Sequence, residues 1–147
     1  MKLVLQRVTR AQVSVAGEVV GSIGPGLVAL VGVAGGDTPA EAETMARKTV
    51  ELRIFRDSAG LTNLSLLDVG GEVLAISQFT LLADTSRGRR PSFIQAARPE
   101  VGKELYERYA AAVERHGVPV ARGVFGAEMQ VELVNDGPFT IWLDSDV

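Results

Sequence analysis

The stretch GEVLAISQFTLLADTSRGRR, residues 71–90, joins a strongly apolar strand to a run of polar side chains. Its VLAI segment has the branched and small apolar residues of a buried strand. If the strand continues, its alternation places Ser77 and Phe79 on one face, and Gln78 and Thr80 on the other. A polar group buried without a partner costs roughly 1–3 kcal/mol. The stretch therefore predicts internal partners for these groups or a strand that opens onto a pocket.

A basic loop follows the strand directly. Residues 84–91, DTSRGRRP, place Arg87, Arg89 and Arg90 within four positions. Guanidinium groups match the geometry of carboxylates and phosphates. A polar strand end that leads into this loop indicates a site for an anionic partner. The structural alternative is that the polar residues bond to neighbouring backbone, as such side chains usually do.

The composition predicts one soluble globular domain over residues 1–147. The chain has no cysteine, which excludes disulfides, thiolate catalysis and cysteine-bound metals. The first residues, MKLVLQR, contain charge too early for a signal peptide, and no apolar run is long enough to cross a bilayer. We therefore expect a cytoplasmic protein without a membrane partner.

The histidine content and the net charge argue against two classes of function, zinc hydrolases and general nucleic-acid binders. The single histidine, His116, lies just before Gly117 near the expected end of a helix, where a cation suits the helix dipole. A zinc hydrolase site usually needs two or three histidines. The formal net charge of −3 argues against a general nucleic-acid binder with a basic face. An acidic chain with one arginine cluster suits a partner held at a single anionic point.

Strand patterns dominate the chain, and two long helices interrupt them. The first helix begins with a capping box, Thr38 to Glu41, that has proline at its first position. The expected class is α+β, with two helices packed on a curved, barrel-like and mainly antiparallel sheet. The expected strands are 2–9, 12–16, 18–23, 27–34 (central), 53–56, the strand that follows Gly71, 119–124, 128–134 and 139–143, and the helices are 38–52 and 99–117; residues 61–68 are expected to be a loop or a short strand.

The segment NDGPFT, residues 135–140, lies between the last two expected strands. As local structure, Asn-Asp-Gly favours a hairpin turn. Pro138 is unusual there, because it removes a hydrogen-bond donor from the start of the returning strand. A peptide bond before proline can also be cis, at about 5–6% in folded proteins. Spacing alone favours the turn.

Three separated motifs closely resemble the D-aminoacyl-tRNA deacylase family. They are SQFTL at 77–81, RGRRPSF at 87–93 and NDGPFT at 135–140. The resemblance runs nearly end to end through QRV at 6–8, NLSLLD at 63–68 and FGA at 125–127.

The resemblance implies a homodimeric proofreading hydrolase of translation quality control. Such an enzyme cleaves the ester between a D-amino acid and tRNA without a cofactor or metal, and its partner is the 3′-terminal aminoacyl-adenosine. In that family the bond between Gly137 and Pro138 is cis, and its loop enters the pocket of the other subunit. There it serves as a chiral filter that rejects L-aminoacyl-tRNA. Glycyl-tRNA, which has no side chain to reject, is an expected substrate.

Carried over by position, the resemblance assigns the other site residues. The pocket wall that holds the terminal adenosine and the ester comprises Ser77, Gln78, Phe79 and Thr80, Arg7 holds the filter loop, and Phe125 and Met129 shape the adenosine site.

The chemistry agrees with this assignment. An aminoacyl ester is activated, so a positioned water and donors to the oxyanion suffice. We expect backbone N–H groups near Gln78 and Phe79 to donate to the oxyanion, and the substrate 2′-hydroxyl to orient the water. Thr80 as a covalent nucleophile is a competing mechanism, and it lacks an evident base. Two other functions stay open, a non-catalytic module that binds RNA ends or nucleotides and an esterase for small molecules.

Overall fold

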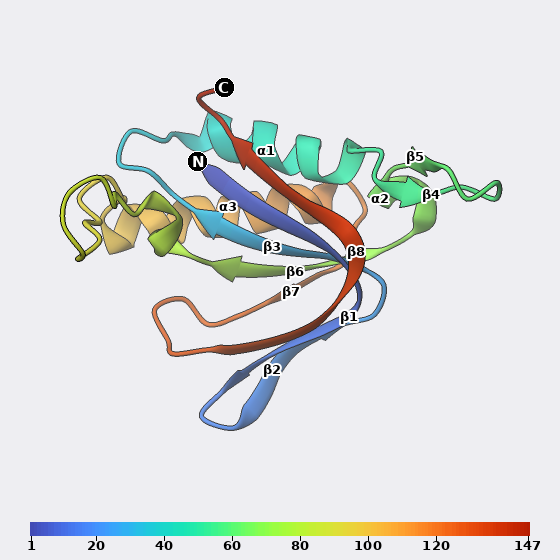
Figure 1. Cartoon of the computed structure of the whole chain (residues 1–147), viewed down its shortest axis with the longest axis horizontal. Coiled ribbons are helices and arrows are strands. Elements are labelled where there is room, and N and C mark those ends of the chain that lie inside the picture. The colour runs from blue at the N-terminus through green and yellow to red at the C-terminus, as the bar shows by residue number, and fades with distance from the viewer.

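Six strands form a curved, nearly closed sheet with two long helices on one face (Figure 1). The computed structural model describes residues 1–147. The strands are β1 (Lys2–Val15), β2 (Glu18–Ile23), β3 (Gly26–Gly32), β6 (Glu72–Ser77), β7 (Val120–Arg122) and β8 (Gln130–Asp144). β1 pairs antiparallel with β2, β3 and β8, whereas β3–β6 and β6–β7 are parallel. The predicted α+β class and barrel-like sheet are confirmed, and the sheet is mixed.

The long strand β1 organises the sheet. Residues 2–8 pair with β3 and residues 11–15 pair with β2 along one edge, while β8 follows the other edge. The prediction of two strands, 2–9 and 12–16, is therefore wrong. The register against β8 shifts on both sides of Val8. Such irregularities bend a strand and increase its twist. The bend lets β1 pair with β3 in its first half and with β2 in its second half.

β8 is also one strand, where a hairpin between two strands was predicted. Asn135 pairs with Val8, Thr140 pairs with Gln6, and the residues between them bulge opposite Arg7. The Gly137–Pro138 peptide bond within this bulge is cis. Pairing with β1 on both sides of the bulge overrides the local turn preference of Asn-Asp-Gly, because the ladder bonds continue before and after it.

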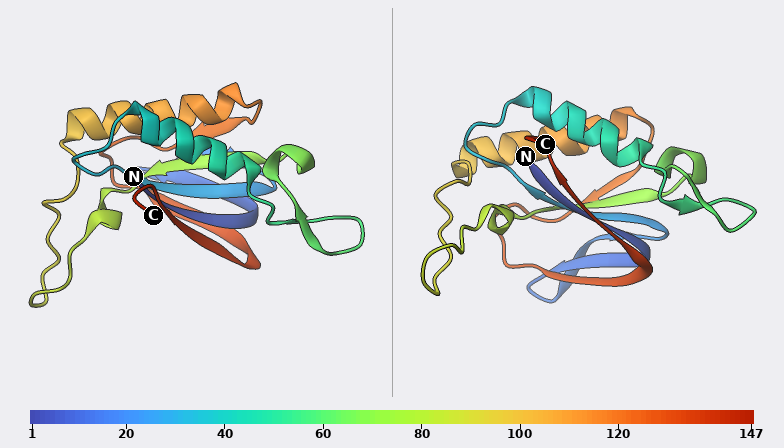
Figure 2. Two further views of the ribbon diagram at one scale, coloured as in Figure 1. Left: turned by 90° about the horizontal axis from the view of Figure 1, so that it is seen from above. Right: turned by 45° about the horizontal axis from the view of Figure 1, so that its top comes forward.

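Helices α1 (Pro39–Glu51) and α3 (Pro99–Arg115) lie side by side on one face of the sheet (Figures 1 and 2). α1 begins as predicted, with the Glu41 carboxylate accepting from the Thr38 N–H at 2.6 Å. Alternate residues of each central strand supply two cores, one on each face. The core beneath the helices includes Leu27, Ala29, Val31, Val73 and Ala75; the core within the curl includes Val8, Val13, Val28, Leu74 and Ile76.

A small unit packs at one end of the sheet. It consists of the hairpin β4 (Phe55–Arg56) and β5 (Thr62–Leu64) and the short helix α2 (Leu66–Val69). Asp57 closes the hairpin loop, because its Oδ1 accepts the N–H groups of Ala59 and Leu61 at 2.9 Å each. None of the helices has the combination of length and apolar character needed to cross a bilayer.

Candidate active site

The SQFTL segment leaves the sheet earlier than its pattern predicts. β6 ends at Ser77, and residues Phe79–Leu82 form a 3-10 helix, η1. The Gln78 N–H makes the last ladder bond, donating to the Val31 carbonyl at 2.7 Å. The expected alternation of side chains is therefore wrong beyond residue 77, because the backbone turns there.

Gly32 allows this turn to pack against β3. A Cβ atom at Gly32 would lie 2.9 Å from the Leu81 Cβ and 3.0 Å from the Gln78 carbonyl oxygen. Real Cβ atoms essentially never lie closer than 3.0 Å to a nonbonded heavy atom. The backbone of residues 78–81 has little freedom to move away. Glycine at this position thus fixes how closely the turn approaches the sheet.

A cavity of about 530 Å³ opens beside the end of β6. Of the predicted site residues, it brings together Ser77, Gln78 and Phe79 with Phe125 and Met129. The remaining lining residues are Val33, Ile76, Phe93, Ala96, Ala97, Pro99, Gly102, Gly126, Ala127 and Val131. No ionisable side chain lines this cavity, so its lining supplies no histidine or carboxylate as a general base.

Aromatic side chains define the cavity wall. Phe79 is 56% exposed, and its ring meets that of Phe93 edge to face, with centroids 5.2 Å apart. Behind the lining residue Phe125, the Tyr106 ring lies with its centroid 6.3 Å away; its hydroxyl donates to the Ala75 carbonyl at 2.7 Å, and burial raises the pKa of Tyr106 to about 12. Phe93 belongs to the RGRRPSF motif but is not among the predicted site residues. Its position directly after the basic loop is the sequence signal for its place in the wall.

Thr80 is placed differently from the other residues of its motif. It does not line the cavity, and its hydroxyl accepts a hydrogen bond from the Gln78 side-chain amide. No basic group contacts this hydroxyl. Among the expected oxyanion donors, the Gln78 N–H is already bonded to Val31. The Phe79 N–H begins η1, where a helix supplies no acceptor of its own.

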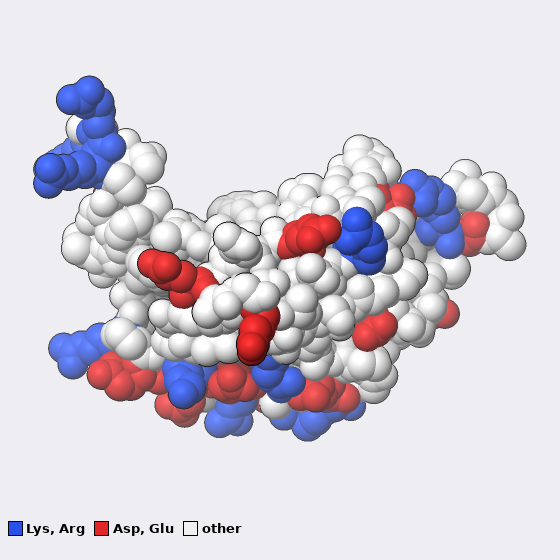
Figure 3. All heavy atoms as spheres, turned by 90° about the horizontal axis from the view of Figure 1, so that it is seen from below, with Lys and Arg blue, Asp and Glu red and all other residues white.

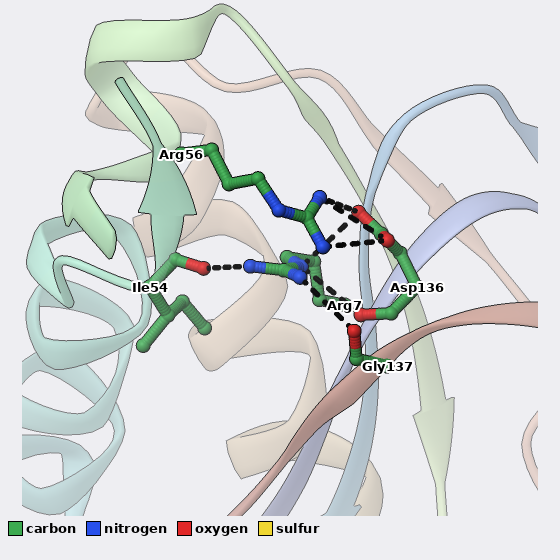
Figure 4. Close-up of polar contacts among 5 residues, drawn as sticks. All are labelled: Arg7, Ile54, Arg56, Asp136 and Gly137. Atoms are coloured by element: carbon green, nitrogen blue, oxygen red, sulfur yellow. Dashed lines mark hydrogen bonds and ion pairs between the residues drawn. The ribbon is translucent and has the colours of Figure 1, made fainter. Parts of the chain in front are cut away.

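Arg7 joins the β8 bulge to Ile54, the residue directly before β4 (Figure 4). It is 2% exposed and donates to the Ile54 carbonyl at 2.6 Å, the Asp136 carbonyl at 3.1 Å and the Gly137 carbonyl at 3.5 Å. Its Nε lies 3.2 Å from the Asp136 carboxylate, which also pairs with Arg56 at 3.2 Å. Burial lowers the pKa of Arg7 from its usual value and Asp136 raises it; an arginine keeps its charge under such shifts.

Gly137 and Pro138 are exposed and lie far from the cavity of their own chain. Ser77 is level with Val31, which pairs with Leu3, whereas Asn135 pairs with Val8. The five residues from position 3 to position 8 correspond to about 16 Å along the strand. Figures 1 and 2 show the bend of β8 at the opposite end of the sheet from the end of β6.

Comparison with known proteins agrees with the resemblance seen in the sequence. A family model described as D-Tyr-tRNA(Tyr) deacylase matches residues 4–144. A D-aminoacyl-tRNA deacylase of Chloroflexus aurantiacus is 58% identical over 145 residues, which cover 99% of this chain and 91% of that protein. One of Deinococcus radiodurans is 58% identical over 144 residues, covering 98% and 99%.

Solved structures share the fold. A structure titled c-Myc DNA Unwinding Element Binding Protein has a TM-score of 0.91 at 40% identity and covers 98% of both chains. A probable eukaryotic D-amino acid tRNA deacylase has a TM-score of 0.84 at 20% identity, covering 97% of both, and supports the fold alone. The full-length match and the high identity give one conclusion: the chain belongs to the D-Tyr-tRNA(Tyr) deacylase family.

Proposed function

We propose that this protein hydrolyses the ester of D-aminoacyl-tRNA to free amino acid and tRNA, as a proofreading step of translation in the cytoplasm. The observation that carries the proposal is the cavity beside SQFTL, which is mostly apolar, free of ionisable side chains and about 530 Å³ in volume. Ligand pockets of about 300–1,000 Å³ hold molecules of the size of a nucleoside. The names of the relatives support the same substrate.

The reaction needs little from the protein beyond positioning. A water attacks the ester carbonyl carbon, and the tetrahedral oxyanion accepts the Phe79 N–H at the start of η1. The bond to the ribose oxygen then breaks, and the proton from the water passes to that leaving oxygen. Because no lining side chain is a base, the neighbouring ribose 2′-hydroxyl orients the water in this proposal. Ser77 and Gln78 hold the sugar and ester in place.

Thr80 has a supporting role in this mechanism. A covalent nucleophile needs an adjacent base or a lowered pKa, and the Thr80 hydroxyl instead bonds to the Gln78 amide. That bond orients Gln78, which lines the cavity. The proposed route is therefore direct attack by water, without an acyl-enzyme.

The active unit in this proposal is a homodimer with exchanged loops. Gly137 and Pro138 are exposed and about 16 Å along the strands from the level of Ser77 in the same chain, so they serve a pocket only across a subunit boundary. Arg7 holds their backbone through bonds to the Asp136 and Gly137 carbonyls. In the partner's pocket these polar backbone groups exclude an L side chain at the α-carbon.

The filter acts by rejection, since it has no group that grips a D side chain. D-amino acids of different sizes are therefore accepted. Glycine has no side chain to exclude, so glycyl-tRNA is hydrolysed as well.

The direct test compares D-tyrosyl-, L-tyrosyl- and glycyl-tRNA with purified protein, with release of labelled amino acid as the readout. The D and glycyl substrates should be deacylated and the L substrate spared. Tight binding of tRNA without release would indicate a binding module. Equal release from D- and L-tyrosyl-tRNA would indicate an esterase without a chiral filter, and sparing of glycyl-tRNA would show that the site recognises a D side chain.

A further inference from the structure

The basic loop is a defined projection from the pocket wall. Two backbone hydrogen bonds between Asp84 and Ser92, of 2.8 and 2.9 Å, close its base. Within it, Asp84 Oδ1 accepts the Ser86 N–H at 2.9 Å, and this bonding lowers the pKa of the Asp84 carboxyl. Gly88 has a φ of +65°, which suits the reversal of the chain at the loop tip. The loop therefore has a stem held by backbone hydrogen bonds, and the carboxylate of its one acidic residue, Asp84, accepts a hydrogen bond within the loop.

The three arginines of this loop are free of partners. Arg87, Arg89 and Arg90 are exposed, and none takes part in an ion pair or a side-chain hydrogen bond. By contrast, Arg115 and Arg122 each pair with glutamates. Figure 3 shows basic side chains projecting from the end of the molecule where Figure 1 places the loop, with no acidic side chain among them.

Both ends of the loop connect to segments that carry lining residues of the cavity, Phe79 of η1 and Phe93. On one side η1 ends at Leu82, two residues before Asp84. On the other side Phe93 follows Ser92 directly, lines the cavity and packs against Phe79. Three residues beyond the stem reach at most about 10 Å. The backbone of each arginine therefore lies within about 10 Å of the loop stem, which adjoins Phe93 of the cavity wall.

We infer that the loop of residues 84–92 binds the RNA phosphates that lie immediately 5′ of the nucleoside held in the cavity. This inference rests on the proposed function, because that function places a 3′-terminal nucleoside there. The chain that leaves the cavity carries a negative charge at each phosphate, whereas the protein as a whole has a net charge of −3. Local arginines are needed to offset that repulsion, and their forked donors match phosphate oxygens.

The inference predicts a specific salt dependence. Three contacts to single-stranded RNA contribute a slope of about −2 to log(kcat/KM) against log[salt]. Raising the salt from about 50 to about 200 mM should therefore weaken the wild type about 20-fold more than a variant with Arg87, Arg89 and Arg90 changed to Gln. The kcat at saturating substrate should not change, because none of the three arginines lines the cavity.

Two further variants make the test specific. Changing the same three residues to Lys keeps the charge and should restore most of the salt slope, although the bidentate geometry is lost. The matched control changes Arg47, Lys48 and Arg108 to Gln; these exposed residues of α1 and α3 form no ion pair, so the same charge is removed elsewhere. The control should retain the wild-type slope. Melting temperatures of all variants show that the fold is kept.

Three results would overturn the inference. They are an unchanged slope in the loop Gln variant, the same loss of slope in the helix control, and failure of the Lys variant to restore it. Fluorescence anisotropy with uncharged tRNA provides an independent readout of the same contacts and should give the same order of variants. A wild type that binds tRNA with this salt dependence but releases no amino acid would refute the proposed function and leave the phosphate contacts supported.

Discussion

Arg7 and Arg56 pair with the same carboxylate, that of Asp136, but Arg7 is buried and Arg56 is exposed. Replacing each of them should therefore change the free energy of unfolding by different amounts. Arg7→Ala removes donors from the Ile54 and Asp136 carbonyls, which accept at 2.6 and 3.1 Å. Each unsatisfied acceptor costs about 1–3 kcal/mol. The guanidinium also lies 4.5 Å from the centre of the Phe139 ring, a contact that contributes about 0.5–2 kcal/mol. With partial relaxation, we expect the free energy of unfolding to fall by about 3–5 kcal/mol.

Arg56→Ala is the matched control. Arg56 pairs with the same Asp136 carboxylate at 3.2 Å, but its side chain is 51% exposed. Exposed ion pairs contribute about 0–1 kcal/mol, so this variant should lose no more than that. Urea denaturation followed by circular dichroism measures both values, with the slope m as the check on two-state unfolding.

The functional readout uses Arg7→Lys, which keeps a buried cation but not the forked donor geometry. If Arg7 positions the filter, this folded variant should hydrolyse L-tyrosyl-tRNA faster than the wild type while keeping most D-tyrosyl-tRNA activity. A loss of stability in Arg7→Ala no greater than in Arg56→Ala would refute the energetic reasoning. An unchanged ratio of D to L rates in Arg7→Lys would refute the positioning role.

Four other outcomes follow from the geometry. Gly32→Ala should cost about 1–3 kcal/mol and lower kcat/KM, because its Cβ would lie 3.0 Å from the Gln78 carbonyl oxygen; wild-type thermal stability and activity would contradict this. Thr80→Val should keep most activity, whereas loss of a nucleophile would cost several orders of magnitude in kcat. Phe93→Ala should raise KM more than it changes kcat, and unaltered kinetics would remove Phe93 from the site. Burial raises the pKa of Tyr106 from 10.0 to about 12, so its stabilising contribution is complete below pH 10 and is lost as the pH rises towards 12; urea midpoints across that range should fall less in Tyr106→Phe.

The sequence predicted the general architecture and the pocket motif, but local patterns misplaced two long strands. Residues 2–15 contain two exposed polar residues, Thr9 and Arg10, that interrupt the apolar pattern, yet β1 continues through them because Arg10 pairs with Val134 of β8. Residues 135–138 have the composition of a turn, yet pairing with β1 resumes at Thr140. In both cases long-range strand pairing overrides local preference, and such pairing is not visible in a short window of sequence.

Other features of the site depend on contacts that no motif records. SQFTL was predicted as a pocket wall, but the turn after Ser77 depends on Gly32, which is far away in the sequence. Arg7 lies on a strand whose pattern gives no sign that its charge is buried; its partner carbonyls come from β8 and from Ile54. The sequence does not mark Phe93 as a site residue, because its ring contacts Phe79, which is 14 positions earlier in the chain, only in the folded structure.

The most direct test of the account uses D-tyrosyl-tRNA with a normal 3′-terminal adenosine beside the same molecule whose terminal ribose lacks the 2′-hydroxyl. The cavity has no ionisable side chain, so the mechanism takes the group that orients water from the substrate. Single-turnover rates with excess protein remove differences in binding. We predict rapid release of D-tyrosine from the normal substrate and almost none from the deoxy substrate, although both bind. Equal single-turnover rates would contradict it.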